Sequence, residues 1–304
     1  MKHMQRWYTV VIPTRQSGKW MSALLEHYRA RSVAPILLID ARTTDDTRQI
    51  AAEYGAQCVE VKDFTFTEAI MPLVKDVVTT PWALFIHDDE IPSDALFERL
   101  DGPEPPAEAQ SVAIPRRWAW YEPGQPLKFG RSDRWADRAL HAGADHAWRL
   151  FRPQEVEYVP AMHSEGFYID KWSRFSSDLY IVHFEWIIRT RAQREEKLRR
   201  YDEYRYGYGV FFEPLYLPER QPEGLIDYFL FETHDYDRLA EVYYSLSEPD
   251  LKIPHHSLRT RVSGMKSRVP DNLGLNDLFK EPSDRRALGV HLEKEIRDTG
   301  RFYI

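Results

Sequence analysis

The sequence has a single cysteine, Cys58, among its 304 residues. One thiol cannot form an internal disulfide, so the chain is not a disulfide-stapled secreted domain, and it suits a reducing compartment. No apolar run reaches 18 residues, so no membrane-spanning helix is predicted. The first residues, Met1 to Arg6, lack the apolar region of a signal peptide. We therefore expect a cytoplasmic protein, with attachment to the periphery of a membrane left open.

Several common catalytic motifs are also absent. The chain has no H-E-x-x-H and no C-x-x-C, and no G-x-G-x-x-G follows the first predicted strand, which argues against a dinucleotide-binding fold. Ser17-Gly18-Lys19 is not a phosphate loop, because Pro13 stands at the required first glycine and Trp20 replaces the serine or threonine. The net charge of −7 argues against broad electrostatic binding of nucleic acid but allows a local basic patch.

The most informative segment that is present is an apolar run, Trp82 to Ile86, which stops at His87 and the three acids Asp88–Glu90. Such a run indicates a buried strand. Adjacent carboxylates repel one another and require water or a cation. At the end of a buried strand they suit a hard divalent metal and the phosphates that it carries. A strand that ends in a solvated acidic turn is the alternative.

Two upstream strands end in the same way. Residues 8–12 are apolar and β-branched and stop at Pro13-Thr14, and residues 36–39 stop at Asp40. Alternating strands and helices predict a parallel sheet with right-handed crossovers, whose carboxyl ends share one ligand-binding edge. We therefore expect these strand ends to converge with Asp88–Glu90. The intervening helical patterns cover residues 21–28, 50–54 and 69–77.

These segments resemble the nucleotide-sugar half of a family 2 glycosyltransferase of the GT-A fold. Val11 to Thr14 resembles the opening strand of that family, and Asp40 with Thr43 to Thr47 resembles its D-D-G-S-T-D-G-T segment. Ile86 to Pro92 resembles L-D-A-D-E-x-P, which contains the metal-binding D-x-D. The resemblance implies that Asp89 is the principal metal ligand and that Asp88 occupies the variable position.

The likeness continues downstream and covers roughly residues 7–205. Asp145 to Arg152 resembles the D-W-x-x-R-L-F-R stretch of transferases that extend lipopolysaccharide cores. His163-Ser164-Glu165 resembles the H-E that follows, and Ile181 to Phe184 with Lys197 and Tyr201 resembles the closing H-Y, K and R-Y segment.

The chain departs from this pattern at several positions. His87 replaces the first Asp of D-x-D, and Ala41 and Arg42 replace an Asp and a Gly of the second motif. A histidine can ligate manganese, so a metal site built from His87 and Asp89 is chemically reasonable. These departures bear on donor preference and on activity.

The resemblance implies an α/β GT-A (Rossmann-like) fold, with a mostly parallel central sheet flanked by helices and a C-terminal helical appendage. We expect a glycosyltransferase domain at 1–187, with a nucleotide-sugar half (1–100) and an acceptor half (111–187), and a mainly helical region at 188–304. The Pro-rich segment 101–110 connects the halves. Further expectations are strands at 111–115 and 177–186, an irregular loop at 116–138, and helices at 191–205, 222–247 and 284–298.

The expected activity is a metal-dependent, inverting transfer of a sugar from a nucleotide-diphosphate sugar to a hydroxyl of a glycan or lipid-linked glycan. The metal would be Mn²⁺ or Mg²⁺, which bind a few protein carboxylates together with phosphate oxygens. Two alternatives stay open. One is transfer to a hydroxylated nucleic-acid base, such as hydroxymethylated DNA. The other is a catalytically degenerate protein that binds nucleotide sugars.

The candidate site residues fall into three groups. The resemblance implies Asp145 as the base that deprotonates the acceptor, and Glu165 is the next candidate. The expected metal ligands are His87, Asp89 and His163, and His163 could contact the pyrophosphate instead of the metal. Arg149 and Arg152 could hold phosphate or pair with nearby acids. The basic segment 252–268 could hold the donor diphosphate, an acceptor phosphate or a nucleic-acid backbone. The expected contacts to the nucleotide sugar are Pro13, Thr14, Arg15, Asp40, Thr43, Asp88, Arg149, Arg152, Arg259 and Arg261.

Overall fold

The computed structural model describes residues 6–62, 64, 66–121, 124, 127–131, 146–159, 166–176, 178–204, 209, 212–213, 216–217, 229–233 and 237–245. The chain divides into two compact units. The first unit comprises residues 1–116 and 146–182, and the second comprises residues 117–145 and 183–304. The domain boundaries expected from the sequence stay a prediction. Among the described residues, no helix is both long and apolar enough to cross a membrane.

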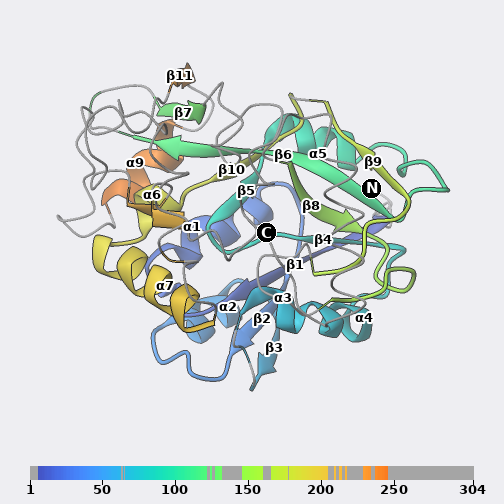
Figure 1. Ribbon diagram of the computed structural model, residues 1–304, viewed down its shortest axis with the longest axis horizontal. Coiled ribbons are helices and arrows are strands. Elements are labelled where there is room, and N and C mark those ends of the chain that lie inside the picture. The colour runs from blue at the N-terminus through green and yellow to red at the C-terminus, as the bar shows by residue number, and fades with distance from the viewer. Residues whose placement is uncertain are drawn as a thin grey trace, which may run out of the picture. The chain divides into compact units, whose positions relative to one another are not determined.

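A parallel sheet forms the centre of the first unit (Figure 1). Its strands lie in the order β3-β2-β1-β4, and neighbours in this series run parallel. Beyond β4 the sheet continues with antiparallel β8 and then β6, and the short strand β9 pairs with β6 in parallel. The bounds are β1 (Tyr8–Thr14), β2 (Ile36–Asp40), β3 (Gln57–Val61), β4 (Trp82–Phe85), β6 (Ser111–Trp120), β8 (His146–Phe151) and β9 (Trp172–Arg174).

Helices flank this sheet, and their apolar residues pack on it. Strand residues such as Val11, Leu38 and Phe85 share one apolar cluster with Ile70 and Val74 from the helical segments. Strands buried on both faces explain the nearly continuous apolar runs in the sequence. The predicted α/β class, with a central sheet flanked by helices, is confirmed. The sheet itself is mixed, because it is parallel over β3-β2-β1-β4 and antiparallel beyond β4. The helices are α1 (Gly18–Arg29), α2 (Thr47–Glu53), α3 (Thr67–Ile70), η1 (Met71–Leu73), α4 (Val74–Val77) and α5 (Asp94–Leu100).

The helix expected at 69–77 is broken into α3, η1 and α4. Pro72 lies within the 3₁₀ turn η1. A proline has no N–H to donate to the preceding turn, and its ring crowds the earlier carbonyl, so a regular helix cannot run through this position.

The second unit contains more strand than the sequence suggested. β6 extends to Trp120, and β7 (Leu127–Arg131) pairs antiparallel with it, so part of the expected irregular loop at 116–138 is a hairpin-like pair. β11 (Phe229–Thr233) pairs antiparallel with β7, which corrects the expectation of a continuous helix over 222–247. Aromatic residues in Phe-Leu-Phe-Glu-Thr favour a strand once a partner edge is present.

The helices of the second unit agree better with expectation. α7 (Arg191–Tyr204) matches the helix expected at 191–205, and α9 (Asp237–Ser245) lies within the expected range 222–247. The strand expected at 177–186 is shorter, because β10 covers only Ile181–His183 and α6 (Glu185–Ile188) follows directly. The helix expected at 284–298 lies outside the described residues.

The side chain of His27 on α1 gives a pH-dependent contribution to the stability of the first unit. Its ring packs against Phe97, with the centroids 5.7 Å apart. Burial, and next the charge of Arg31, lower the pKa of His27 from 6.5 to about 4. Because the unfolded chain then binds a proton that the folded chain does not, stability should fall as the pH drops from 6.5 to about 4.

We expect this loss to reach about 3 kcal/mol, at 1.36 kcal/mol per pKa unit. The variant His27→Gln should lose this part of the pH dependence. Urea unfolding of both proteins at several pH values between 7 and 4 measures the difference. Parallel stability curves for the two proteins would show that His27 titrates normally in the folded state.

Candidate active site

The carboxyl ends of three parallel strands meet at one edge of the sheet in the first unit. β1 ends at Thr14, β2 ends at Asp40, and the acids Asp88–Glu90 follow β4. The strand register places Thr14 opposite Ile39 and Val11 opposite Phe85. This convergence is the one expected from alternating strands and helices.

The three acids are buried, so the alternative of a solvated acidic turn is wrong. Asp88 and Asp89 are each 5% exposed, and Glu90 is fully buried. Within the cluster, Asp88 accepts hydrogen bonds from the hydroxyl of Thr14 (2.9 Å) and from that of Ser17. Asp88 therefore fastens the loop after β1 to the segment after β4.

The carboxylate of Glu90 is stabilised by two arginine side chains from strands that lie far from Glu90 in the sequence. Its carboxylate accepts hydrogen bonds from Arg149 of β8 (2.8 Å) and Arg116 of β6 (3.2 Å). It also accepts the backbone N–H of His87 at 3.0 Å. Arg149 Nη2 lies 3.3 Å from Nδ1 of His87 as well. Charge pairing and hydrogen bonds of this kind allow a carboxylate to be buried, and Arg149 here pairs with a nearby acid.

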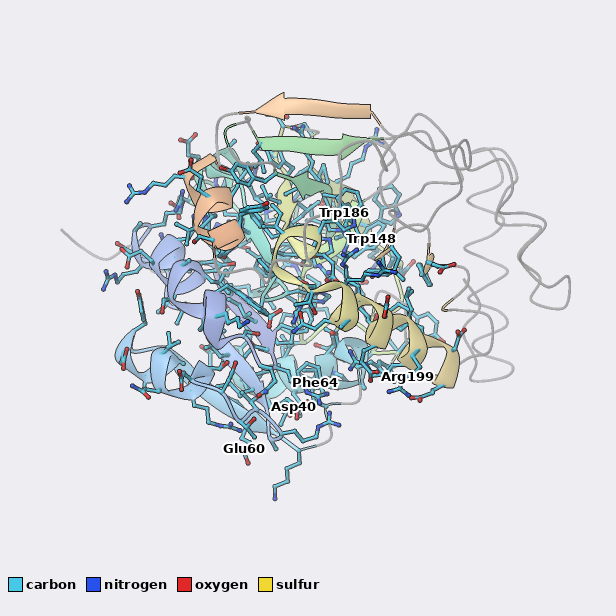
Figure 2. The ribbon with its side chains drawn as sticks, turned by 90° about the vertical axis from the view of Figure 1, so that its left-hand side faces the viewer. Asp40, Glu60, Phe64, Trp148, Trp186 and Arg199 are labelled. Atoms are coloured by element: carbon cyan, nitrogen blue, oxygen red, sulfur yellow. The ribbon has the colours of Figure 1, made fainter. Side chains whose placement is uncertain are left out.

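Asp40, which is labelled in Figure 2, is also buried, and two arginines contact its carboxylate. The guanidinium of Arg42 donates from Nε to Oδ1 (3.0 Å) and from Nη2 to Oδ2 (2.8 Å), and Arg15 Nε lies 3.6 Å from Oδ2. Burial raises the pKa of Asp40, but the hydrogen bonds from Arg42 outweigh it, so the net pKa lies below its usual value. Asp40 is therefore ionised, and its carboxylate oxygens are hydrogen-bonded to Arg42.

The loops after β1 and β2 are tied to each other. The Asp45 carboxylate accepts hydrogen bonds from the Gly18 N–H (2.8 Å) and from the hydroxyl of Thr47 (2.6 Å), and Thr47 in turn accepts the Ser17 N–H at 2.9 Å. A Cβ at Gly18 would lie only 3.0 Å from Asp45 Oδ2, so the residue must be small for this approach. The edge of the sheet is thus held in one arrangement by side chains that reach across the loops.

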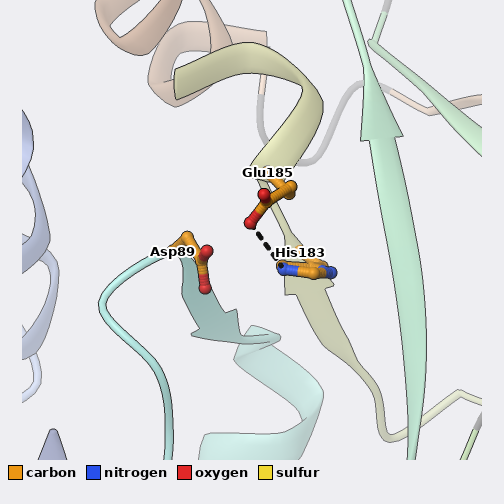
Figure 3. Close-up of side chains that lie close together, drawn as sticks. All are labelled: Asp89, His183 and Glu185. Atoms are coloured by element: carbon orange, nitrogen blue, oxygen red, sulfur yellow. Dashed lines mark ion pairs between the residues drawn. The ribbon is translucent and has the colours of Figure 1, made fainter. Parts of the chain in front are cut away.

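Asp89 belongs to a group of possible metal ligands. It directly precedes β5 (Glu90–Pro92), which pairs with β10, the strand that ends at His183. Asp89, His183 and Glu185 each offer one ligand atom, and these atoms lie within 4.8 Å of one another (Figure 3). Two carboxylate oxygens and one imidazole nitrogen fit Mn²⁺, and the oxygens also suit Mg²⁺.

His183 and Glu185 also have other contacts. Glu185 Oε2 lies 3.1 Å from Lys197 Nζ and 3.9 Å from His183 Nε2. The His183 ring packs edge-on against Trp118, with centroids 4.2 Å apart. Neither residue was predicted as a metal ligand. In the sequence, these two residues are a His and a Glu two positions apart at the end of a buried strand. This pattern only weakly indicates a metal site when the strand pairing is not known.

The remaining predicted residues lie in several places. Pro13 is buried within β1, Arg15 is 41% exposed on its side chain, and Thr43 donates its N–H to the carbonyl of Asp40 at 2.9 Å. Arg152 stacks over the ring of Trp82 at 4.5 Å. Trp82 begins β4, whereas the acids follow the end of that strand, so the contacts of Arg152 place it away from the acid cluster. Asp145, His163, Glu165, Arg259 and Arg261 lie outside the described residues.

Comparison with solved structures finds distant likenesses. Glucosyl-3-phosphoglycerate synthase from Mycobacterium tuberculosis, in complex with Mn²⁺, UDP and glucosyl-3-phosphoglycerate, is 14% identical, with a TM-score of 0.41 over 76% of this chain and 88% of that one. S. aureus TarS (residues 1–349) is 13% identical, with a TM-score of 0.40 over 98% of this chain and 93% of that one. At these TM-scores neither likeness determines the fold or the activity of this chain.

Comparison of sequences gives a more direct result. No protein-family model matches the chain. Glycosyltransferase AglJ from Haloferax volcanii is 26% identical over 125 residues, which cover 40% of this chain and 40% of that protein. The chain thus matches this curated relative over well under half of the relative's length. Over that stretch, the predicted resemblance of this chain to the glycosyltransferases is confirmed.

Proposed function

We propose that this protein is a metal-dependent glycosyltransferase. It would move a sugar, with inversion, from a nucleotide-diphosphate sugar to a hydroxyl of a glycan or lipid-linked glycan. The observation that carries the proposal is the buried acid cluster Asp88–Glu90 at the carboxyl edge of a parallel sheet, joined there by Thr14 and Asp40. The sequence similarity to a named glycosyltransferase supports the same activity.

The donor requires a site for a diphosphate, because negative charge develops on the leaving phosphate during sugar transfer. Asp89, His183 and Glu185 would hold a divalent ion, and such an ion supplies charge stabilisation to the leaving group when bound. Asp88 and Thr14 hold the loop after β1 in place. Arg15, whose side chain is 41% exposed at the same edge, would bind a phosphate of the donor.

An inverting transfer also requires a base that removes the proton of the acceptor hydroxyl. Asp145 remains our candidate, with Glu165 next, and the acceptor phosphate or the donor could be held by Arg259 and Arg261. These roles rest on the sequence, since all four residues lie outside the described part of the chain.

Thermal unfolding with a panel of nucleotide sugars and Mn²⁺ tests the proposal. A ligand that binds only the folded state stabilises it by RT ln(1 + [L]/Kd), so at a concentration 100 times Kd we expect a gain of about 2.7 kcal/mol and a clearly raised Tm. EDTA should remove most of this gain. If no nucleotide sugar or free nucleoside diphosphate raises the Tm at millimolar concentration, with or without metal, the proposal is wrong.

A further inference from the structure

Lys197 of α7 contacts Glu185, one of the candidate metal ligands. Its Nζ donates a hydrogen bond to Oε2 of Glu185 at 3.1 Å, and the two side chains are 27% and 1% exposed. The other carboxylate oxygen, Oε1, is buried and has no hydrogen-bond partner among the described residues. A buried carboxylate requires cations or hydrogen-bond donors around its oxygens. Lys197 supplies one such contact, and a bound metal ion would supply another.

The ammonium group of Lys197 also contacts an aromatic ring. Its Nζ lies 4.4 Å from the centroid of the Tyr216 ring. The face of such a ring carries partial negative charge and attracts cations. The backbone at Tyr216 is in turn bound to α7, because Nη1 of Arg194 donates to the Tyr216 carbonyl at 2.6 Å. The position of the Lys197 ammonium group is therefore set by the packing of the second unit as well as by Glu185.

An ion that binds to Glu185 meets this positive charge at short range. Asp89 and Glu185 bring two carboxylates to the group of candidate ligands, and a neutral His183 adds no charge (Figure 3). Lys197 cancels one of the two carboxylate charges. Like charges a few ångströms apart repel strongly at the effective dielectric constant of about 20 that applies to partly buried groups. The ion is thus attracted less than two carboxylates alone would attract it.

We propose that Lys197 is a positioning residue of the metal site and acts as its counter-ion. It neutralises Glu185 before an ion binds, and it lowers the affinity of the site for a free divalent ion. This inference rests on the proposed function, because it takes Asp89, His183 and Glu185 as the metal site. The ion, its three ligands and Lys197 together carry a net positive charge, which the diphosphate of a donor would neutralise. The site would therefore hold the ion more tightly with the donor than without it.

Calorimetric titration of the full chain with Mn²⁺ alone tests this inference. Lys197→Met removes the charge and keeps an unbranched side chain of similar length. This variant should bind Mn²⁺ at least about tenfold more tightly than the wild type, on the scale of one hydrogen bond to a charged group. Lys197→Arg keeps the charge and should bind Mn²⁺ as the wild type does. Loss of a purely structural contact would not raise the affinity for the ion.

Arg199→Met is the matched control. Arg199 lies on the same helix, its side chain is 58% exposed, and it pairs with Glu196 and Glu203. The substitution changes the net charge by the same amount as Lys197→Met, and it should leave the affinity for Mn²⁺ unchanged. Thermal unfolding gives a second measurement. In EDTA, Lys197→Met should be less stable than the wild type, and a given Mn²⁺ concentration should raise its Tm by more.

The outcomes separate this inference from the proposed function. Unchanged or weaker Mn²⁺ binding by folded Lys197→Met, or an equal tightening in Arg199→Met, would overturn the role of Lys197 while the metal site stands. If neither the wild type nor Lys197→Met binds Mn²⁺ at millimolar concentration, the metal dependence of the proposed function is wrong, and this inference with it. Circular dichroism verifies that each variant is folded, and Lys197→Gln repeats the test if Lys197→Met is not.

Discussion

Replacing Asp89 by alanine is expected to lower the rate of sugar transfer by at least about a hundredfold, the usual scale for loss of one group that stabilises developing charge. Asp89 is buried beside two further candidate ligands, and its carboxylate would be the principal ligand of the ion. Steady-state assays of nucleoside diphosphate release by both proteins, over a range of Mn²⁺ concentrations, measure the change.

Two comparisons make this result specific. The variant Glu53→Ala removes an exposed acid on α2 that accepts a hydrogen bond from Gln49, and it should keep normal activity. Circular dichroism verifies that the Asp89 variant is folded. Near-normal turnover of Asp89→Ala in the presence of EDTA would mean that the reaction does not depend on a metal at this position.

The second large effect concerns Glu90 and stability. The variant Glu90→Ala should destabilise the first unit by about 3–5 kcal/mol, because it leaves Arg149 and Arg116 without the buried charge that they face. Glu90 is fully buried, whereas the side chains of its two partners are 13% and 20% exposed. Urea unfolding followed by fluorescence measures the difference in the free energy of unfolding.

An exposed ion pair of the same unit provides the control. Glu60 pairs with Arg48 at 3.3 Å, with side-chain exposures of 58% and 38%. Water screens this pair, so Glu60→Ala should cost less than about 1 kcal/mol. Similar small losses in both variants would show that the Glu90 pairs contribute little, and that burial of the acids is tolerated for another reason.

The carboxyl edge of the sheet could be predicted from the sequence because its determinants are local. Each strand is a short apolar run that ends at a proline or an acid, as at Pro13 and Asp40, and helical patterns separate the runs. The alternation restricts the topology to a parallel sheet, and a parallel sheet brings its strand ends together. This prediction did not require knowing which strands pair with one another.

The burial of the acids could not be predicted in this way. Asp88 and Glu90 are buried because Thr14, Arg116 and Arg149 reach them from other strands. Two of these partners follow the acids by many residues, on β6 and β8, and antiparallel pairing brings them near. A single sequence shows the charges of such residues but not which acid each of them meets.

The same limit applies to His183 and Glu185, whose closeness to Asp89 depends on the pairing of two very short strands. Arg42 is a different case. Arg42 lies only two positions from Asp40, so this ion pair could have been predicted from the sequence. The resemblance to the glycosyltransferases implied Asp40 as a contact to the nucleotide sugar, whereas its carboxylate is paired with Arg42, the arginine that stands in place of a glycine.

The measurement that tests the central claim most directly is detection of the transferred sugar. Purified protein with Mn²⁺ and the nucleotide sugar that gives the largest thermal stabilisation is incubated with candidate glycan acceptors, and the products are analysed by mass spectrometry. We predict a metal-dependent increase in acceptor mass by one sugar residue, with release of an equal amount of nucleoside diphosphate. Tight binding of the nucleotide sugar without any release, even to water, would contradict the claim and would identify a binding protein that lacks transferase activity.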